Sequence, residues 1–111
     1  MSPAYVYLGL AIIAEVVATT ALKASEEFSR LLPSLLVVFG YAFAFWALSI
    51  VIRTIPVGIA YAVWAGVGVV LVAVASAIIY RQIPDLAAII GMTLIVSGVV
   101  IMHLFSKSVP H

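Results

Sequence analysis

Residues 58–80 read GIAYAVWAGVGVVLVAVASAIIY and contain no charged side chain. A helix needs about 20 predominantly apolar residues to cross the hydrocarbon core of a bilayer, and this run is long enough. Strands of a membrane barrel would instead alternate apolar and polar residues over about ten positions. Because every backbone amide in hydrocarbon needs an internal hydrogen-bond partner, the run is predicted to be a transmembrane helix.

Three more apolar runs of similar length occupy most of the remaining sequence, and short connections rich in charge and proline separate them. We therefore expect an all-α integral membrane protein in which residues 1–111 form a single domain of four transmembrane helices. The predicted spans are 4–22, 31–52, 58–80 and 86–105. Side chains near the predicted ends that suit the membrane interface are Tyr5, Tyr7, Tyr80 and Lys107.

The composition supports a protein made almost entirely of membrane spans. Of its 111 residues 67% are hydrophobic and 8% are charged, whereas a soluble domain is about 45–50% apolar and about 25% charged. This excludes a soluble enzyme. A net charge of +1 gives no basic surface for nucleic acid. No cysteine is present, and no spacing typical of a metal site or a catalytic nucleophile occurs. We expect neither an enzyme nor a cofactor.

The Lys and Arg residues of the connections divide almost evenly between the two sides of the predicted membrane topology. Arg53 and Lys107 fall on one side, and Lys23, Arg30 and Arg81 on the other. An excess of Lys and Arg normally marks the cytoplasmic side. A difference of one leaves two interpretations open: the charges do not decide the orientation, or the chain inserts both ways.

Glu15 lies near the middle of the span 4–22. An ionisable side chain there costs at least about 2.5–3.5 kcal/mol, and such residues commonly mark functional sites. The other spans contain no Lys or Arg that would be a fixed partner. Because low dielectric disfavours the charged form, Glu15 can hold a proton and release it when a cation arrives. The alternative is a protonated Glu15 hydrogen-bonded to a neighbouring helix.

Helical spacings of three, four and seven residues place several side chains on the face of Glu15. They are Leu8, Ala11, Ile12, Ala18, Thr19 and Leu22. The small Ala11 and Ala18 leave room beside the carboxyl group, although close helix packing would use the same residues.

Aromatic residues are the second feature of the spans. Tyr61 and Trp64 are three residues apart and share a helical face. Ring faces attract cations, and tryptophan attracts them most strongly. One carboxylate and several rings suit a bulky lipophilic organic cation. For Phe39, Phe43 and Trp46 we favour packing or lipid contact instead.

Glycines mark two further positions. Gly66 and Gly68 lie mid-span, where a helix can kink or hinge. Gly91 and Gly98 are seven residues apart on one face of the last span, which indicates helix association. We expect this association between subunits, with an intramolecular role as the alternative.

The chain is short for a transporter. Known transporters often build a midplane site from two inverted repeats, and 111 residues do not hold two such halves. Two copies inserted in opposite orientations would supply the symmetry, and the near-balanced connection charges permit it. We therefore favour an antiparallel homodimer.

Three segments carry a family resemblance. Residues 7–23 (YLGLAIIAEVVATTALK), 55–68 (IPVGIAYAVWAGVG) and 90–99 (IGMTLIVSGV) resemble the small multidrug resistance transporters, in register and over essentially the whole chain. The resemblance implies a multi-pass protein of the bacterial inner membrane that works as an antiparallel homodimer. It further implies export of lipophilic aromatic or quaternary ammonium cations in exchange for protons.

The resemblance also assigns roles to residues. It implies that Glu15 is the carboxylate shared by protons and substrate. Gly66 and Gly68 become the flexible point of the third helix, and Gly91 and Gly98 the dimerising face. The other residues implied at the substrate site are Tyr61, Trp64, Tyr41, Phe45, Leu8, Ala11, Ile12 and Thr19. Ala18, on the face of Glu15, completes the predicted site.

Some positions depart from the family pattern. Ala65 and Ala44 stand where members have serine, Ala18 where a member has glycine, and Arg81 where glycine is common. The substrate range is therefore left open. The alternatives are a guanidinium-type small-cation exporter of the same family and a structural or regulatory membrane subunit without transport.

Overall fold

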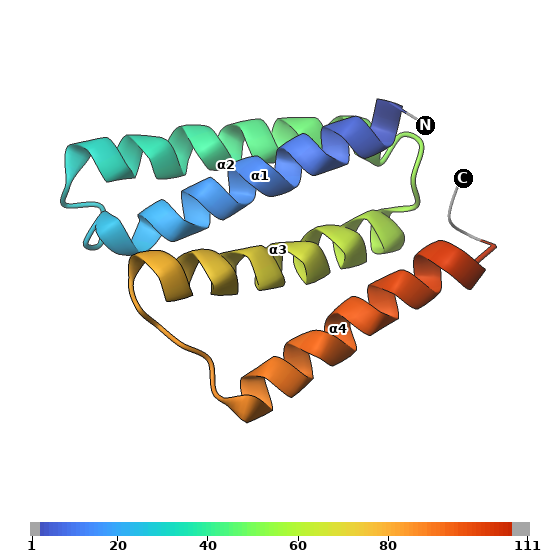
Figure 1. The fold of residues 1–111 in the computed structure, drawn as a ribbon. Coiled ribbons are helices and arrows are strands. Elements are labelled where there is room, and N and C mark those ends of the chain that lie inside the picture. Colours follow the sequence, from blue (N-terminus) through green and yellow to red (C-terminus); the bar gives the residue numbers. More distant parts are fainter. Residues whose placement is uncertain (1–2, 108–111) are drawn as a thin grey trace.

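A computed structural model describes residues 3–107 as four α-helices joined by short connections (Figure 1). Within that part of the chain there is no strand, and each helix is long and apolar enough to cross a membrane. The all-α fold with four membrane-spanning helices is thereby confirmed. The helices are α1 (Pro3–Ala24), α2 (Leu31–Val51), α3 (Val57–Ile79) and α4 (Leu86–Phe105).

The ends of these helices differ from the predicted spans by at most two residues, and α4 matches at both ends. At a rise of about 1.5 Å per residue the helices are about 30–35 Å long, which fits a hydrocarbon core of about 30 Å. Residues 1, 2 and 108–111 of the expected single domain lie outside the described residues.

Local sequence signals explain where the helices begin and end. Pro33 lies in the first turn of α2, where a missing amide hydrogen costs nothing. Pro56 precedes α3. Asp85 caps α4, because its side chain accepts a hydrogen bond of 2.9 Å from the amide of Ala88. After α3 the chain turns away at Arg81, whose φ of 57° lies in the left-handed region.

The connection between α1 and α2 is a tight turn built around Ser25. This residue is fully buried, donates through Oγ to the carbonyl of Leu22 at 2.6 Å and accepts from the amide of Phe28 at 3.2 Å. Glu26, Glu27 and Phe28 have φ values of 47°, 63° and 65°. Such values are strained for residues with a Cβ, so the Ser25 hydrogen bonds hold a conformation that the backbone disfavours.

The helices form a flat body of 45 × 34 × 19 Å. Helix α1 packs against α2 and α3, and α3 packs against α4; α1 and α2 lie side by side in Figure 1, with α3 beneath them. The apolar core sits at the end where α1 and α3 begin. It consists of Ala4, Leu8, Ile12, Val51, Ile55, Ala60 and Trp64.

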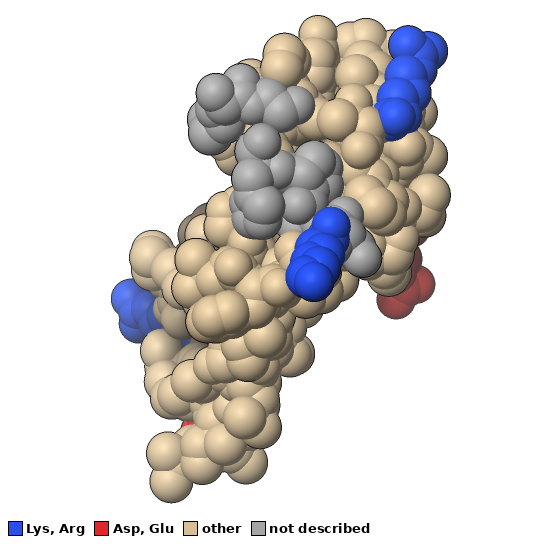
Figure 2. Space-filling model, turned by 90° about the vertical axis from the view of Figure 1, so that its right-hand side faces the viewer, with Lys and Arg blue, Asp and Glu red and all other residues tan. Residues whose placement is uncertain are grey.

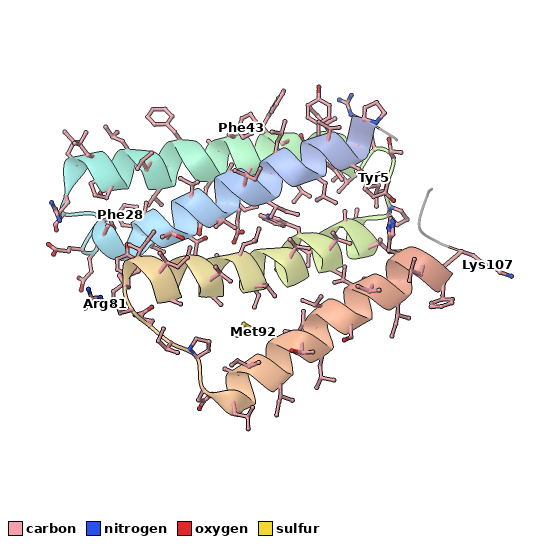
Figure 3. The ribbon with its side chains drawn as sticks, in the orientation of Figure 1. Tyr5, Phe28, Phe43, Arg81, Met92 and Lys107 are labelled. Carbon is pink, nitrogen blue, oxygen red and sulfur yellow. The ribbon has the colours of Figure 1, made fainter. Side chains whose placement is uncertain are left out.

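Helix α4 has no buried residue and diverges from α3 toward its own N-terminal end (Figure 1). A cavity of about 620 Å³ separates the two helices, and Met92 points from α4 into the gap (Figure 3). A Cβ at Gly91 or Gly98 would meet nothing within 4 Å. The face predicted to associate is thus uncovered within this chain, and the dimer stays a prediction.

The described surface is largely apolar, with many large hydrophobic side chains exposed to the surroundings. Figure 2 shows one end of the molecule, where Lys and Arg side chains and a few acidic side chains lie at separate places on a largely uncharged surface. Such a surface suits contact with lipid or with other apolar helices.

Candidate functional site

The Glu15 carboxylate lies between α1, which carries it, and α3. Thr19, one turn further along α1, donates through Oγ1 to Oε1 of Glu15 at 3.3 Å. The other carboxylate oxygen, Oε2, is buried and has no hydrogen-bond partner among the described residues. It faces Gly68 of α3 so closely that a Cβ built there would lie 2.8 Å from Oε2. The glycine therefore provides the space that the carboxylate occupies.

Thr19 connects this carboxylate to α2. Its Oγ1 lies 2.5 Å from the hydroxyl oxygen of Tyr41. Because the single hydroxyl hydrogen of Thr19 is donated to Glu15, Tyr41 is the donor to Thr19. The hydrogen bonds thus run from Tyr41 through Thr19 to Glu15. Thr19 therefore contacts the carboxylate directly, and Tyr41 is linked to it through Thr19. Both residues were predicted at the site.

Four predicted aromatic residues form a continuous series of ring contacts across α2 and α3. The rings of Tyr41 and Phe45 are stacked with centroids 6.3 Å apart. Phe45 meets Trp64 edge-on at 5.5 Å, and Trp64 meets Tyr61 edge-on at 5.7 Å. These separations are typical of favourable aromatic pairs. We call Tyr41, Phe45, Trp64 and Tyr61 the ring series.

Within the ring series Trp64 is buried, and the two rings that contact it are exposed. Trp64 is 8% exposed, whereas Phe45 and Tyr61 are 56% and 59% exposed. The Nε1 atom of Trp64 is buried without a hydrogen-bond partner among the described residues. Trp64 also belongs to the apolar core, so it contributes to packing and to the ring series at once.

The four other predicted site residues of α1 are buried by packing. Leu8 and Ile12 belong to the core cluster together with Trp64, and Ala11 and Ala18 are fully buried. Ala18 packs against α2, because a Cβ at Gly40 would lie 2.8 Å from the Cβ of Ala18. This pairing was not predicted, because Gly40 stands among apolar and aromatic residues without a spacing pattern.

Gly66 and Gly68 face different neighbours although they are two residues apart. A Cβ at Gly66 would lie 2.8 Å from Cγ2 of Val99 and 3.2 Å from Cγ2 of Ile95, both on α4, whereas Gly68 faces Glu15. Helix α3 is continuous through both glycines. Each glycine thus has a close neighbour on another helix, and the hinge stays a prediction.

The cavity of about 620 Å³ between α3 and α4 is not lined by Glu15 or by the ring series. The carboxylate and the rings instead lie where α1, α2 and α3 meet. In residues 3–107 no group of three or more His, Cys, Asp or Glu side chains is placed to hold a metal ion. A carboxylate near aromatic rings has groups that can take up a proton and attract a cation.

The chain is similar to known bacterial transport and resistance proteins. It is 51% identical over 111 residues to the multidrug transporter EmrE of Escherichia coli strain K12, with the whole of both chains covered. It is 53% identical over 107 residues to the quaternary ammonium compound-resistance protein QacF of Klebsiella aerogenes and 52% identical over 107 residues to the multidrug transporter PA4990 of Pseudomonas aeruginosa. In both cases 96% of this chain and 97% of the relative are covered.

A sequence model of the family described as Small Multidrug Resistance protein matches residues 3–95. Together with four membrane-spanning helices, these similarities confirm the expected location in the bacterial inner membrane as a multi-pass protein. None of the three relatives is named as an enzyme. The chain belongs to the Small Multidrug Resistance protein family.

Proposed function

We propose that the chain is a proton-coupled antiporter that exports lipophilic aromatic or quaternary ammonium cations. The observation that carries the proposal is a half-buried carboxylate, with one oxygen unpartnered among the described residues, beside a series of four aromatic rings. Two relatives are named as multidrug transporters and one as a quaternary ammonium compound-resistance protein, which supports this substrate class.

The mechanism is competition for Glu15. A carboxylate charge in a low-dielectric site is unfavourable unless it is paired, so Glu15 carries either a proton or an organic cation. Thr19 holds Oε1 in place, while Oε2 is left available to the proton or the cation. Ring faces of the series attract the cation further. An inward proton gradient then drives the cation outward, and each ligand weakens the binding of the other by the same free energy.

A second copy of the chain is the proposed partner. Tyr61 and Phe45 are more than half exposed, so the site needs a further wall before it encloses a cation. An antiparallel copy would bring its own Glu15 to the same site and cover the open faces at Gly91 and Gly98. In this dimer Gly66 and Gly68 would allow α3 to bend between a state open to one side of the membrane and a state open to the other.

Proton release on cation binding tests this function. The purified protein in detergent is mixed with a quaternary ammonium cation in a weakly buffered solution, and the pH is recorded. We expect the pH to fall for the wild type and to stay constant for Glu15→Gln. Glu26→Gln, which alters an exposed carboxylate in the α1–α2 connection, is the control and should behave as wild type.

The same measurement separates the alternatives. Proton release that persists in Glu15→Gln would refute the role of Glu15. A response to guanidinium but not to the quaternary cation would favour a small-cation exporter, and no response to any cation would favour a subunit without transport.

A further inference from the structure

Helices α1 and α3 run in the same direction and begin at the same end of the molecule (Figure 1), but their two ends are held together in different ways. Where they begin, the core cluster joins them through buried Leu8, Ile12, Ala60 and Trp64. Beyond Gly68, no residue of α3 is buried. The fully buried contacts of this helix pair therefore lie in its first half.

A cavity of about 390 Å³ lies between α1, α2 and α3 toward their opposite end. Its walls include Ala21 from α1 and Ala75 and Ile79 from α3. The hydroxyl oxygen of Thr20, which also lines the cavity, is buried and has no hydrogen-bond partner among the described residues. Water that enters this otherwise apolar cavity would find a hydrogen-bond partner in the Thr20 hydroxyl.

Tyr80 connects the two helices across this loosely packed end. Its hydroxyl donates to the carbonyl oxygen of Thr20 at 2.6 Å. The Nζ of Lys23 lies 5.5 Å from the centroid of the Tyr80 ring, within the range of a cation–π contact. Thr20 and Lys23 are three residues apart on α1 and so share a face. One side chain at the end of α3 thus makes two polar contacts with the end of α1.

We propose that Tyr80 is a latch that keeps this end of the α1–α3 pair closed and that its release opens a water path to Glu15. Glu15 and Gly68 lie between the packed core and the latch, so the far half of α3 moves while the helix bends at Gly66 and Gly68. The inference rests on the proposed exchange at Glu15, to which the latch adds control of access from one side. Tyr80 acts as a positioning residue and does not touch the cation.

Thiol labelling measures the opening directly. The chain has no cysteine, so a single cysteine introduced by Ala75→Cys reports on the cavity wall alone. The rate of reaction with a charged, water-soluble maleimide is compared with and without Tyr80→Phe, which removes the hydroxyl and keeps the ring. We expect labelling about fivefold faster, the change that follows from losing one hydrogen bond of ordinary net strength. Lys23→Gln should also accelerate labelling.

Two controls make the result specific. Ala60→Cys places the reporter in the packed core, where Ala60 is fully buried, and its labelling should not respond to Tyr80→Phe. Tyr7→Phe deletes the same atom from a tyrosine that contacts Trp46 of α2, and it should leave labelling at residue 75 unchanged.

An unchanged rate at residue 75 in Tyr80→Phe would overturn the latch. An equal acceleration at residue 60 would overturn it as well, because the substitution would then loosen the whole bundle. Labelling requires no transport, so the latch is tested independently of the proton-release assay. Failure of the proposed function would appear in the proton-release assay, in the comparison of wild type with Glu15→Gln. It would not alter the labelling rates.

Discussion

Gly68 faces the carboxylate that we propose to be the exchange site, and replacing it by alanine tests that placement. The added Cβ would lie 2.8 Å from Oε2 of Glu15. Ordinary contacts for a Cβ begin at 3.4 Å, so the carboxylate has to move by about 0.6 Å, on the scale at which misplacement of a reacting group lowers activity strongly.

The expected costs to folding and to binding differ. Oε2 is the far end of a flexible side chain and moves by rotation, while alanine is favoured over glycine in a helix by about 1 kcal/mol. The free energy of unfolding should therefore not fall. A displacement of about 1 Å can cost roughly 100-fold, and about half of that distance predicts roughly tenfold weaker cation binding, or about 1.4 kcal/mol.

Gly66→Ala is the matched control for this substitution. It adds the same methyl group two residues away, but the new Cβ would meet Val99 and Ile95 of α4 and not Glu15. Equilibrium binding of a quaternary cation to purified protein is measured for both variants, since turnover would also respond to a hinge. We expect weaker binding for Gly68→Ala alone. Wild-type affinity in Gly68→Ala, or an equal loss in Gly66→Ala, would refute this reasoning.

Three stability changes follow from the connections, and reversible denaturant unfolding in detergent measures all of them. Arg81→Gly should raise the free energy of unfolding by about 1 kcal/mol, because φ of 57° is strained for arginine and not for glycine; a decrease would contradict the strain. Ser25→Ala should lower it by about 1–3 kcal/mol, because it removes the two hydrogen bonds of Oγ with the carbonyl of Leu22 and the amide of Phe28, and no change would mean that water replaces the hydroxyl. Asp85→Ala removes the cap of α4 and should cost about 1 kcal/mol, whereas Asp85→Asn, which keeps an acceptor, should cost much less.

The extents of the helices were predictable because charge and proline mark their ends. Pro33, Pro56 and Asp85 stand within the first turn or directly before it. Glu15 was predictable as a functional residue for a related reason, since a membrane span tolerates a carboxylate only at a cost. Both predictions depend on residues that are conspicuous in an apolar sequence.

The faces by which the helices meet were not predictable in the same way. In a soluble helix the apolar stripe identifies the buried face, but lipid is as apolar as a protein core, and these helices are apolar all round. The sequence therefore did not distinguish Gly66, which faces α4, from Gly68, which faces Glu15. It also did not pair Ala18 with Gly40. Tyr80 was predicted only as an interfacial residue, and its contacts with Thr20 and Lys23 depend on the packing of α1 against α3.

The surroundings of Glu15 provide too little to stabilise its charge within one chain. An ionisable group in mid-membrane costs at least about 2.5–3.5 kcal/mol, whereas one hydrogen bond, here from Thr19, contributes about 1.5–3 kcal/mol when the acceptor is charged. At 3.3 Å this bond is longer than typical hydroxyl bonds, so the lower part of that range applies. The part of this free-energy cost that Thr19 does not offset must be offset by the ligand that binds at Oε2. In the proposed mechanism a proton removes the charge, and an organic cation held against the ring series pairs it. In the proposed mechanism, exchange of one ligand for the other follows from the balance of these energies.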